Sequence, residues 1–284
     1  MPFNARVMLR KSQIIGLLVP LLFAGGSARV DGGSLPALQV KPWEGYFVAH
    51  EIRACQFALG CDGVGTITPK NRRGESFGLN RALGFVMSVE EVLPSGKVVV
   101  RRVDPDSLET KDKATTKPKT VKYRGKVTGD ASFEAVMEFE GSKMRLGGRV
   151  LDPGKLKNPL RFVVKVVVRD LYHGADPKDR DFRRKVKDDE VRYETLAGKR
   201  GKIEMGEEVD ADVEKTISDK GLASMRFESG VYKGRRFEFS CVDGGAIRIE
   251  HPAGKPLTGG MMIGWRPDPK KDAEGKARLE ISVR

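Results

Sequence analysis

Apolar and charged side chains alternate with a period of two along much of this chain. In residues 133–140 (FEAVMEFE), four apolar side chains occupy every second position and three glutamates fall between them. Successive side chains of a β-strand point to opposite faces, so this pattern predicts a strand with one buried and one solvated face. The same alternation recurs in residues 191–195, 209–213, 225–228, 237–241, 247–250 and 277–283. The chain is therefore expected to be all-β, with antiparallel, sandwich-like sheets in one or two domains and few helices.

Two further segments refine this expectation. Residues 160–168 (LRFVVKVVV) are apolar almost throughout, which predicts a central strand covered on both faces. Pro94-Ser95-Gly96 separates two strand-like runs and is typical of a hairpin connection. Only residues 79–93 (LNRALGFVMSVEEVL) offer a helical alternative, and their second half fits a strand equally well.

The first 28 residues have the three-part pattern of a secretory signal. A basic start with Arg6, Arg10 and Lys11 precedes an apolar run of eleven, residues 14–24, and small residues follow at 26–28. Eleven residues rise only about 16 Å as a helix, roughly half of a hydrocarbon core, so an uncleaved membrane anchor is the weaker alternative. We expect cleavage after residue 28 and a secreted or periplasmic protein with no remaining membrane span.

Removal of this signal changes the size and charge of the chain. It leaves 284 − 28 = 256 residues, with 52 − 3 = 49 basic against 39 acidic side chains, or a net charge of +10 instead of +13. With 39% apolar and 32% charged residues, the composition excludes a helical membrane bundle. A chain of this length can form one large core or two modest ones.

Two charged segments interrupt the strand pattern. Residues 105–126 carry seven basic and three acidic side chains and are expected to form a long basic loop. Residues 176–190 carry six charges of each sign and are expected to be a linker or exposed hairpin. They divide the mature chain into a β-rich N-terminal domain, residues 29–175, and a β-rich C-terminal domain, residues 191–284.

The three cysteines leave two interpretations open. Export favours oxidation, so Cys55, Cys61 and Cys241 could form one disulfide and leave one free thiol. Alternatively, all three are buried and reduced and act as small apolar side chains. No C-x-x-C pair occurs, so cysteine ligation of a metal is not expected.

One pentapeptide has the form of a catalytic motif. Gly74-Glu-Ser76-Phe-Gly78 matches G-x-S-x-G, in which the serine is a hydrolase nucleophile on a turn between a buried strand and a helix. The preceding residues are polar and basic, and the helices that such a fold needs are missing. Only His173 and His251 follow Ser76 and could act as its base. A glycine-rich loop is the default interpretation, and an exported hydrolase is kept as an alternative.

Other catalytic and metal-binding patterns are weaker still. Residues 207–214 could place Asp210, Asp212 and Glu214 on one side of a strand, but they lack the pattern of a calcium loop. No histidine pair has zinc-ligand spacing, so no metal and no cofactor is expected. A pair of carboxylates that cleaves polysaccharide leaves no local signature, so such a pair stays unlocated.

The positive charge favours an anionic partner. The candidate polyanion-binding side chains of the basic loop are Lys113, Lys117, Lys119, Lys122, Arg124 and Lys126. An envelope polysaccharide fits an exported protein better than nucleic acid does, because few aromatic residues are available to stack on bases. We expect an exported, non-catalytic β-rich protein with a binding or structural role in the cell envelope or periplasm. The two alternatives are the hydrolase and polyanion binding through residues 105–126.

Overall fold

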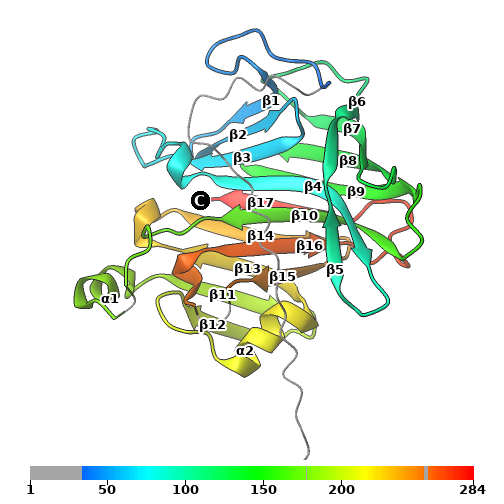
Figure 1. The fold of residues 1–284 in the computed structure, drawn as a ribbon. Coiled ribbons are helices and arrows are strands. Elements are labelled where there is room, and N and C mark those ends of the chain that lie inside the picture. Colours follow the sequence, from blue (N-terminus) through cyan, green and yellow to red (C-terminus); the bar gives the residue numbers. More distant parts are fainter. Residues whose placement is uncertain (1–33, 177, 253–254) are drawn as a thin grey trace, which may run out of the picture.

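The structure is a computed structural model that describes residues 34–176, 178–252 and 255–284. Over these residues the chain forms seventeen strands and two short α-helices, and all strand pairs between these strands are antiparallel (Figure 1). The predicted all-β class with few helices is therefore confirmed. The predicted secretory signal lies outside the described residues, within which no helix has the length and apolar character needed to cross a bilayer.

The first of two runs of paired strands, called here sheet I, is centred on β4 and β10. In spatial order its strands are β1 (Tyr46–Glu51), β2 (Cys55–Gly60), β3 (Val64–Pro69), β4 (Leu83–Val92), β10 (Leu160–Val168), β16 (Met261–Arg266) and β15 (Ala246–Glu250). β5 (Val98–Arg101) pairs with the end of β4 through the predicted hairpin at Pro94-Ser95-Gly96. β10 pairs with strands on both sides, in agreement with the expected central strand.

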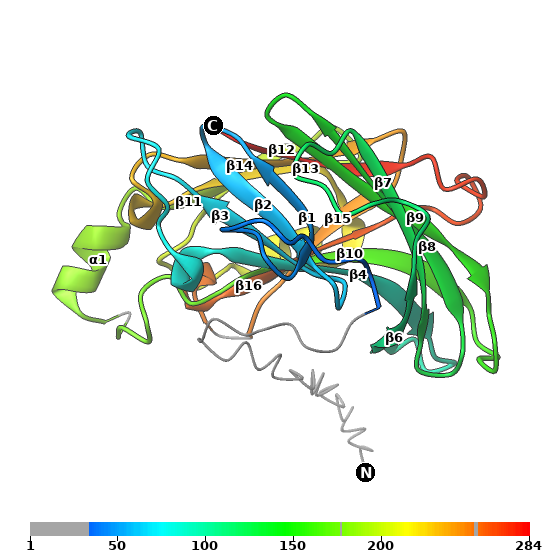
Figure 2. The ribbon, with the colours of Figure 1, turned by 90° about the horizontal axis from the view of Figure 1, so that it is seen from above.

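The second run, sheet II, contains nine strands. In spatial order they are β12 (Arg200–Glu204), β11 (Glu190–Thr195), β13 (Leu222–Glu228), β14 (Arg236–Val242), β17 (Arg278–Val283), β9 (Lys143–Asp152), β8 (Ser132–Glu140), β7 (Thr120–Val127) and β6 (Val103–Glu109). A single pair, Leu222 with Ile247, joins β13 of sheet II to β15 of sheet I. Figure 2 shows β4, β10 and β16 on one side of the molecule and β13 and β14 on the other.

The core forms between the inner faces of the two sheets. Phe133 of β8 lies 6.2 Å from Phe162 of β10, and Phe57 of β2 lies 5.0 Å from Phe139 of β8, measured between ring centroids. These side chains belong to the apolar half of the alternating pattern and are buried. The alternation therefore turns every second side chain of sheet II away from the core, onto what we call its polar face.

Strands that precede residues 176–190 in the sequence pair with strands that follow them. β10 pairs with β16, and β9 pairs with β17. Residues 180–186, expected in a linker or hairpin, instead form helix α1 (Arg180–Val186), because Asp179 caps its first turn and Phe182 and Val186 are buried.

Two other local predictions are wrong. Residues 209–213 were expected to form a strand, but Asp210 accepts hydrogen bonds from Asp212 N and Val213 N and starts helix α2 (Ala211–Lys215), which a π-helical turn (Thr216–Lys220) continues. Residues 105–126 are not one long loop, because alternate residues of β7 are buried and its strand pairs with β8 and β6. Only residues 110–119 connect the two strands β6 and β7.

Candidate functional site

The polar face of sheet II carries charged and hydroxyl side chains in rows that cross the strands. Residues directly opposite in neighbouring strands define each row. One row runs in the order Lys202, Arg192, Arg226, Glu238, Ser282, Lys143. The next runs in the order Arg200, Glu194, Ser224, Ser240, Glu280, Arg145. Adjacent strands lie about 4.8 Å apart, so each row repeats a polar group at that interval.

A groove of about 740 Å³ lies on this face, over strands β11 to β14 and β17. Its charged and hydroxyl lining consists of Arg192, Tyr193, Glu194, Arg200, Lys202, Ser224, Arg226, Glu238, Ser240, Glu280, Ser282 and Arg284. Five of these side chains are cationic and three are anionic, which leaves an excess of two positive charges. This lining suits a polar ligand with negative charge.

Three cations stand side by side at one end of the groove. Lys202, Arg192 and Arg226 are directly opposite one another on β12, β11 and β13. Like charges in this position destabilise a sheet, so the arrangement needs compensation. Glu190 supplies part of it, by accepting from Arg192 and by pairing with Lys202 at 3.4 Å. Those two cations also hold the pKa of Glu190 below its usual range, against the opposing effect of burial.

Arg226 is the cation that the protein leaves without compensation. Within the described part of the chain it forms no ion pair, and its Nε atom is buried without a hydrogen-bond partner. Glu238 is directly opposite on β14, but Glu238 pairs with Arg284 at 3.1 Å and accepts from Ser282 at 3.2 Å. Because a guanidinium has five N–H donors, Arg226 keeps donors for a bound ligand.

The carboxylates that line the groove are engaged by cations. Glu280 accepts from Arg145 at 2.9 Å and pairs with Lys143 at 2.9 Å. These contacts hold the pKa of Glu280 below its usual value although burial acts in the opposite direction. Glu194 accepts from Arg200 at 2.9 Å. Ionised and paired carboxylates position the cations around them and leave Arg226 as the open donor group.

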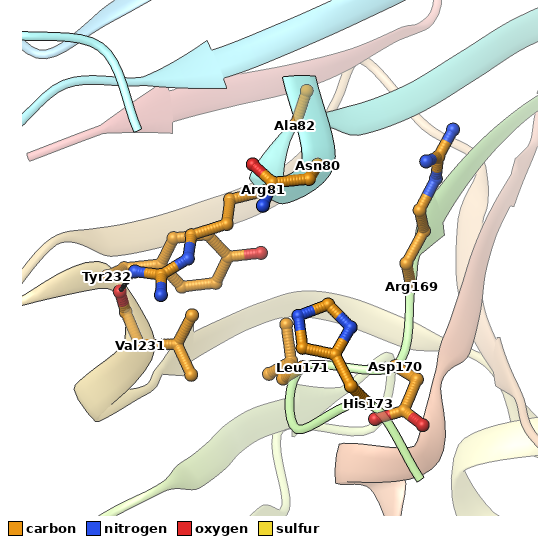
Figure 3. A pocket seen from close by; sticks show the side chains of 9 residues that line it. All are labelled: Asn80, Arg81, Ala82, Arg169, Asp170, Leu171, His173, Val231 and Tyr232. Carbon is orange, nitrogen blue, oxygen red and sulfur yellow. Dashed lines mark hydrogen bonds between the residues drawn. The ribbon is translucent and has the colours of Figure 1, made fainter. Parts of the chain in front are cut away.

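A second, much smaller cavity lies at one end of the sandwich (Figure 3). Its volume is about 10 Å³, which is the space of a single water molecule. Asn80, Arg81, His173 and Tyr232 line it together with Ala82, Arg169, Asp170, Leu171 and Val231. A cavity of this size cannot enclose an organic substrate.

The three catalytic candidates predicted from the sequence, Ser76, His173 and His251, do not hydrogen-bond to one another within the described part of the chain. Ser76 is in the exposed loop after β3, where its Oγ accepts from Gly78 N at 3.0 Å. His173 lines the small cavity, and His251 lies at the end of β15, where its Nδ1 is 3.1 Å from the carbonyl oxygen of Pro252. Among the described residues, neither histidine makes a hydrogen bond to Ser76.

The six basic candidates of residues 105–126 divide into two groups. Lys113, Lys117 and Lys119 are exposed in the 110–119 connection, which lies along β1 through the contact of Thr115 with Val48. Lys122, Arg124 and Lys126 are exposed on β7, and Arg124 pairs with Glu134 at 3.2 Å. The second group alternates with the buried residues of β7 and so belongs to the polar face of sheet II.

The three cysteines are free thiols, so the disulfide interpretation is wrong. The alternative of buried, reduced cysteines holds for Cys55 and Cys61, whereas Cys241 is reduced but only half-buried. Cys55 is the first residue of β2, and Cys61 directly follows its last residue. Because a strand rises about 3.3 Å per residue, the two cysteines are too far apart to form a disulfide. Burial raises the pKa of the Cys55 thiol to about 12 and that of Cys241 to about 11. Neither thiol is therefore an activated nucleophile.

The outer face of sheet I holds a buried ion cluster around Glu90. This carboxylate accepts from Arg266 at 2.6 and 2.8 Å and from Arg161 at 2.9 Å, and Lys165 lies 3.3 Å away. Burial opposes ionisation, but the three cations prevail and lower the pKa of Glu90 to about 2. Glu90 is fully buried and its charge is matched by these three cations, although Nη1 of Arg266 has no hydrogen-bond partner among the described residues. We therefore assign the pairing around Glu90 to stability.

The groove residues have no sequence signature of a binding site. Arg192 and Arg226 lie in segments predicted as strands, at positions that the alternation assigns to the solvated face. Their alignment depends on the pairing of β11 with β12 and β13, which one strand sequence does not reveal. The acidic run at 207–214 forms no metal site, since within the described ranges no three His, Cys, Asp or Glu side chains gather in a way that could hold an ion.

Comparison with known proteins leaves the family open. No family model matches this chain, and neither does any curated protein sequence. A solved α-N-acetylgalactosaminidase from Bifidobacterium bifidum aligns at 13% identity with a TM-score of 0.49, over 83% of this chain and 36% of that chain. This chain thus spans about a third of that enzyme.

Two shorter solved proteins align over most of their length. A protein from Synechocystis sp. PCC 6803 aligns at 11% identity with a TM-score of 0.43, over 83% of this chain and 94% of that chain. A galactose mutarotase related enzyme from Lactobacillus acidophilus aligns at 10% identity with a TM-score of 0.39, over 83% and 96% of the two chains. Carbohydrate-related enzymes are thus among the structural neighbours, at identities too low to assign a function.

Proposed function

We propose that this chain is an exported β-sandwich protein that binds an acidic polysaccharide along the groove of sheet II. The cell envelope or periplasm is the proposed location, on the basis of the signal pattern in residues 1–28. The role is binding, without chemical conversion of the ligand.

The observation that carries the proposal is the row Lys202, Arg192, Arg226. A protein gains nothing in stability from three cations directly opposite one another, and such local conflicts are expected where a ligand is bound. The row presents a positive group about every 4.8 Å across the strands. A linear polymer with one acidic group on each sugar unit provides negative groups at a comparable repeat.

The remaining lining favours a saccharide over nucleic acid. Ser224, Ser240 and Ser282 supply hydroxyl groups that can donate to and accept from sugar hydroxyls. Phe239 also borders the groove, but it is buried and stacks on Phe227, with ring centroids 6.2 Å apart. Phe239 therefore offers no exposed platform on which bases could stack. The other aromatic residue of the lining, Tyr193, is half-buried and packs against the core.

The charge state of the groove supports binding over hydrolysis. A glycoside hydrolase needs one carboxylic acid that stays protonated near neutral pH, which requires a raised pKa. Glu280 has the opposite shift, because Lys143 and Arg145 stabilise its ionised form. All described carboxyl groups whose pKa departs clearly from the ordinary value are lowered, namely Glu51, Glu90, Asp130, Glu190, Glu274 and Glu280.

The test is affinity electrophoresis in gels that contain either polygalacturonate or neutral dextran. The proposal predicts retardation by the acidic polymer that weakens steeply as salt increases, and migration in dextran like that in an empty gel. Equal retardation in both gels would indicate a neutral saccharide ligand and contradict the charge argument. No retardation by polygalacturonate at low salt would refute the proposed function.

A further inference from the structure

The outer face of sheet I carries a second group of cations, away from the groove of sheet II. Arg248, Gly264 and Lys165 are directly opposite one another on β15, β16 and β10, three strands that lie side by side (Figure 1). Arg266 follows Gly264 by two residues on β16 and so points to the same face. Lys165 alternates with Val164, a core residue, so this face is turned away from sheet II.

Arg248 is a cation that the described chain does not neutralise. Its side chain is half-buried, and among the described residues it forms neither a hydrogen bond nor an ion pair. Burial, followed by the positive charges of Arg266 and Arg161, lowers the pKa of Arg248. The negative charges of Asp219 and Glu90 act in the opposite direction and offset this only in part. The positive form of Arg248 is therefore held in an unfavourable place.

Arg266 provides a buried donor on the same face. Its Nε and Nη2 atoms donate to Glu90 at 2.6 and 2.8 Å, and Nη2 also donates to Glu250 at 2.9 Å. Its Nη1 atom is buried and has no hydrogen-bond partner within the described residues. Because Nε and Nη2 form the edge that faces Glu90, Nη1 is on the side away from that carboxylate. It lies over Gly264, where an added Cβ would be 3.2 Å from Nη1.

The charges on this face leave a positive excess. Glu90 and Glu250 are both engaged by cations of the cluster, and the exposed Asp219 adds one further negative charge near Arg248. Four cations oppose these three carboxylates, namely Arg161, Lys165, Arg248 and Arg266. Buried donors in folded proteins are nearly always paired, so the free Nη1 atom and the unneutralised Arg248 together indicate an absent anionic partner.

We infer that Arg248 and Nη1 of Arg266 bind one oxyanion group, of the phosphate or carboxylate class, on the outer face of sheet I. An oxyanion there accepts a hydrogen bond from Nη1 and neutralises Arg248, which removes the repulsion between the two guanidinium groups. The planar donors of guanidinium match the oxygens of both classes. Glu90 is a positioning residue in this site, because its two hydrogen bonds fix the orientation of Arg266.

Isothermal titration calorimetry of the full chain at constant ionic strength tests this inference, with inorganic phosphate and acetate as separate probes. The wild type is expected to bind at least one of them saturably, and the tighter probe identifies the class of oxyanion. Arg248→Gln is expected to weaken this binding about ten-fold or more, as for loss of a charged hydrogen-bond donor. The variant breaks no interaction with a described residue, so it should fold, and circular dichroism checks that it does.

Arg226→Gln is the matched control, because it removes another arginine without an ion pair, from the groove of sheet II. It is expected to bind the probe as the wild type does. The inference is overturned if the wild type binds neither probe, if folded Arg248→Gln binds normally, or if Arg226→Gln loses binding equally. Arg248→Gln should still be retarded by polygalacturonate, so failure of this inference and failure of the proposed function are distinguishable.

Discussion

Arg226 and Glu238 are directly opposite each other on β13 and β14, yet among the described residues they form no ion pair. Glu238 is held instead by Arg284 and Ser282. On its other side Arg226 faces Arg192, a like charge. The guanidinium of Arg226 therefore lies in the groove with a repulsive neighbour and no internal partner, which is the arrangement expected of a ligand-binding cation.

Replacing Arg226 is expected not to destabilise the fold. Arg226→Gln removes the repulsion from Arg192 and breaks no ion pair, so the free energy of unfolding should stay the same or rise by up to about 0.5 kcal/mol. Urea denaturation measures this change. Arg278→Gln is the matched control, because Arg278 pairs with Glu138 at 2.9 Å and its loss should cost stability. A clear destabilisation by Arg226→Gln would assign Arg226 a structural role.

Glu90→Gln is expected to be strongly destabilising. Glu90 is fully buried, and its neutralisation leaves Arg266, Arg161 and Lys165 without their shared counter-charge. Breaking a buried ion pair from one side typically costs about 3–5 kcal/mol. Urea unfolding at neutral pH measures the loss, with the exposed Glu274→Gln as control. A loss no larger than that of the control would show that the cluster contributes little.

The same carboxylate predicts a loss of stability in acid. Its pKa is about 2 in the folded chain, below the ordinary value of 4.5, so the folded state favours the ionised form. This contribution is complete above about pH 4.5 and disappears as the pH falls toward 2, with a magnitude of about 3 kcal/mol. Urea unfolding at several pH values between 2 and 7 should show the decline. Glu90→Gln should show a shallower decline, and equal slopes would contradict the assignment.

The free thiols give a prediction that needs no ligand. Titration of the unfolded protein with a thiol reagent, without reductant, should find three thiols per chain. In the native protein Cys55 should react slowly, because it is buried and its pKa is raised to about 12. Recovery of a single thiol after unfolding would demonstrate a disulfide and contradict the structure.

The sequence predicts the strands well and the helices poorly, for a physical reason. Alternation identified the segments that became β8, β11, β13, β14, β15 and β17, because one buried face imposes a period of two. Residues 209–213 also alternate, but the side chain of Asp210 bonds to the backbone of Asp212 and Val213 and starts α2. Such a local cap overrides a short periodic pattern.

The candidate sites depend on contacts between distant segments, which one sequence does not reveal. Arg226 becomes notable only when β11 and β14 are placed beside β13. The small cavity lined by Tyr232 needs three connections to meet, and the sequence points to only one of its lining residues, His173. The serine motif pointed elsewhere, because Ser76 forms its hydrogen bond within its own loop.

The most direct test of the proposed function compares retention on immobilised polygalacturonate for three proteins. These are the wild type, Arg226→Gln, and a triple variant in which Lys113, Lys117 and Lys119 of the 110–119 connection become Gln. The account predicts that Arg226→Gln elutes at a much lower salt concentration than the wild type. The triple variant should elute only slightly earlier than the wild type, by the small amount expected for three fewer positive charges. The opposite order, with the triple variant released early and Arg226→Gln retained, would contradict the groove and locate binding at the connection.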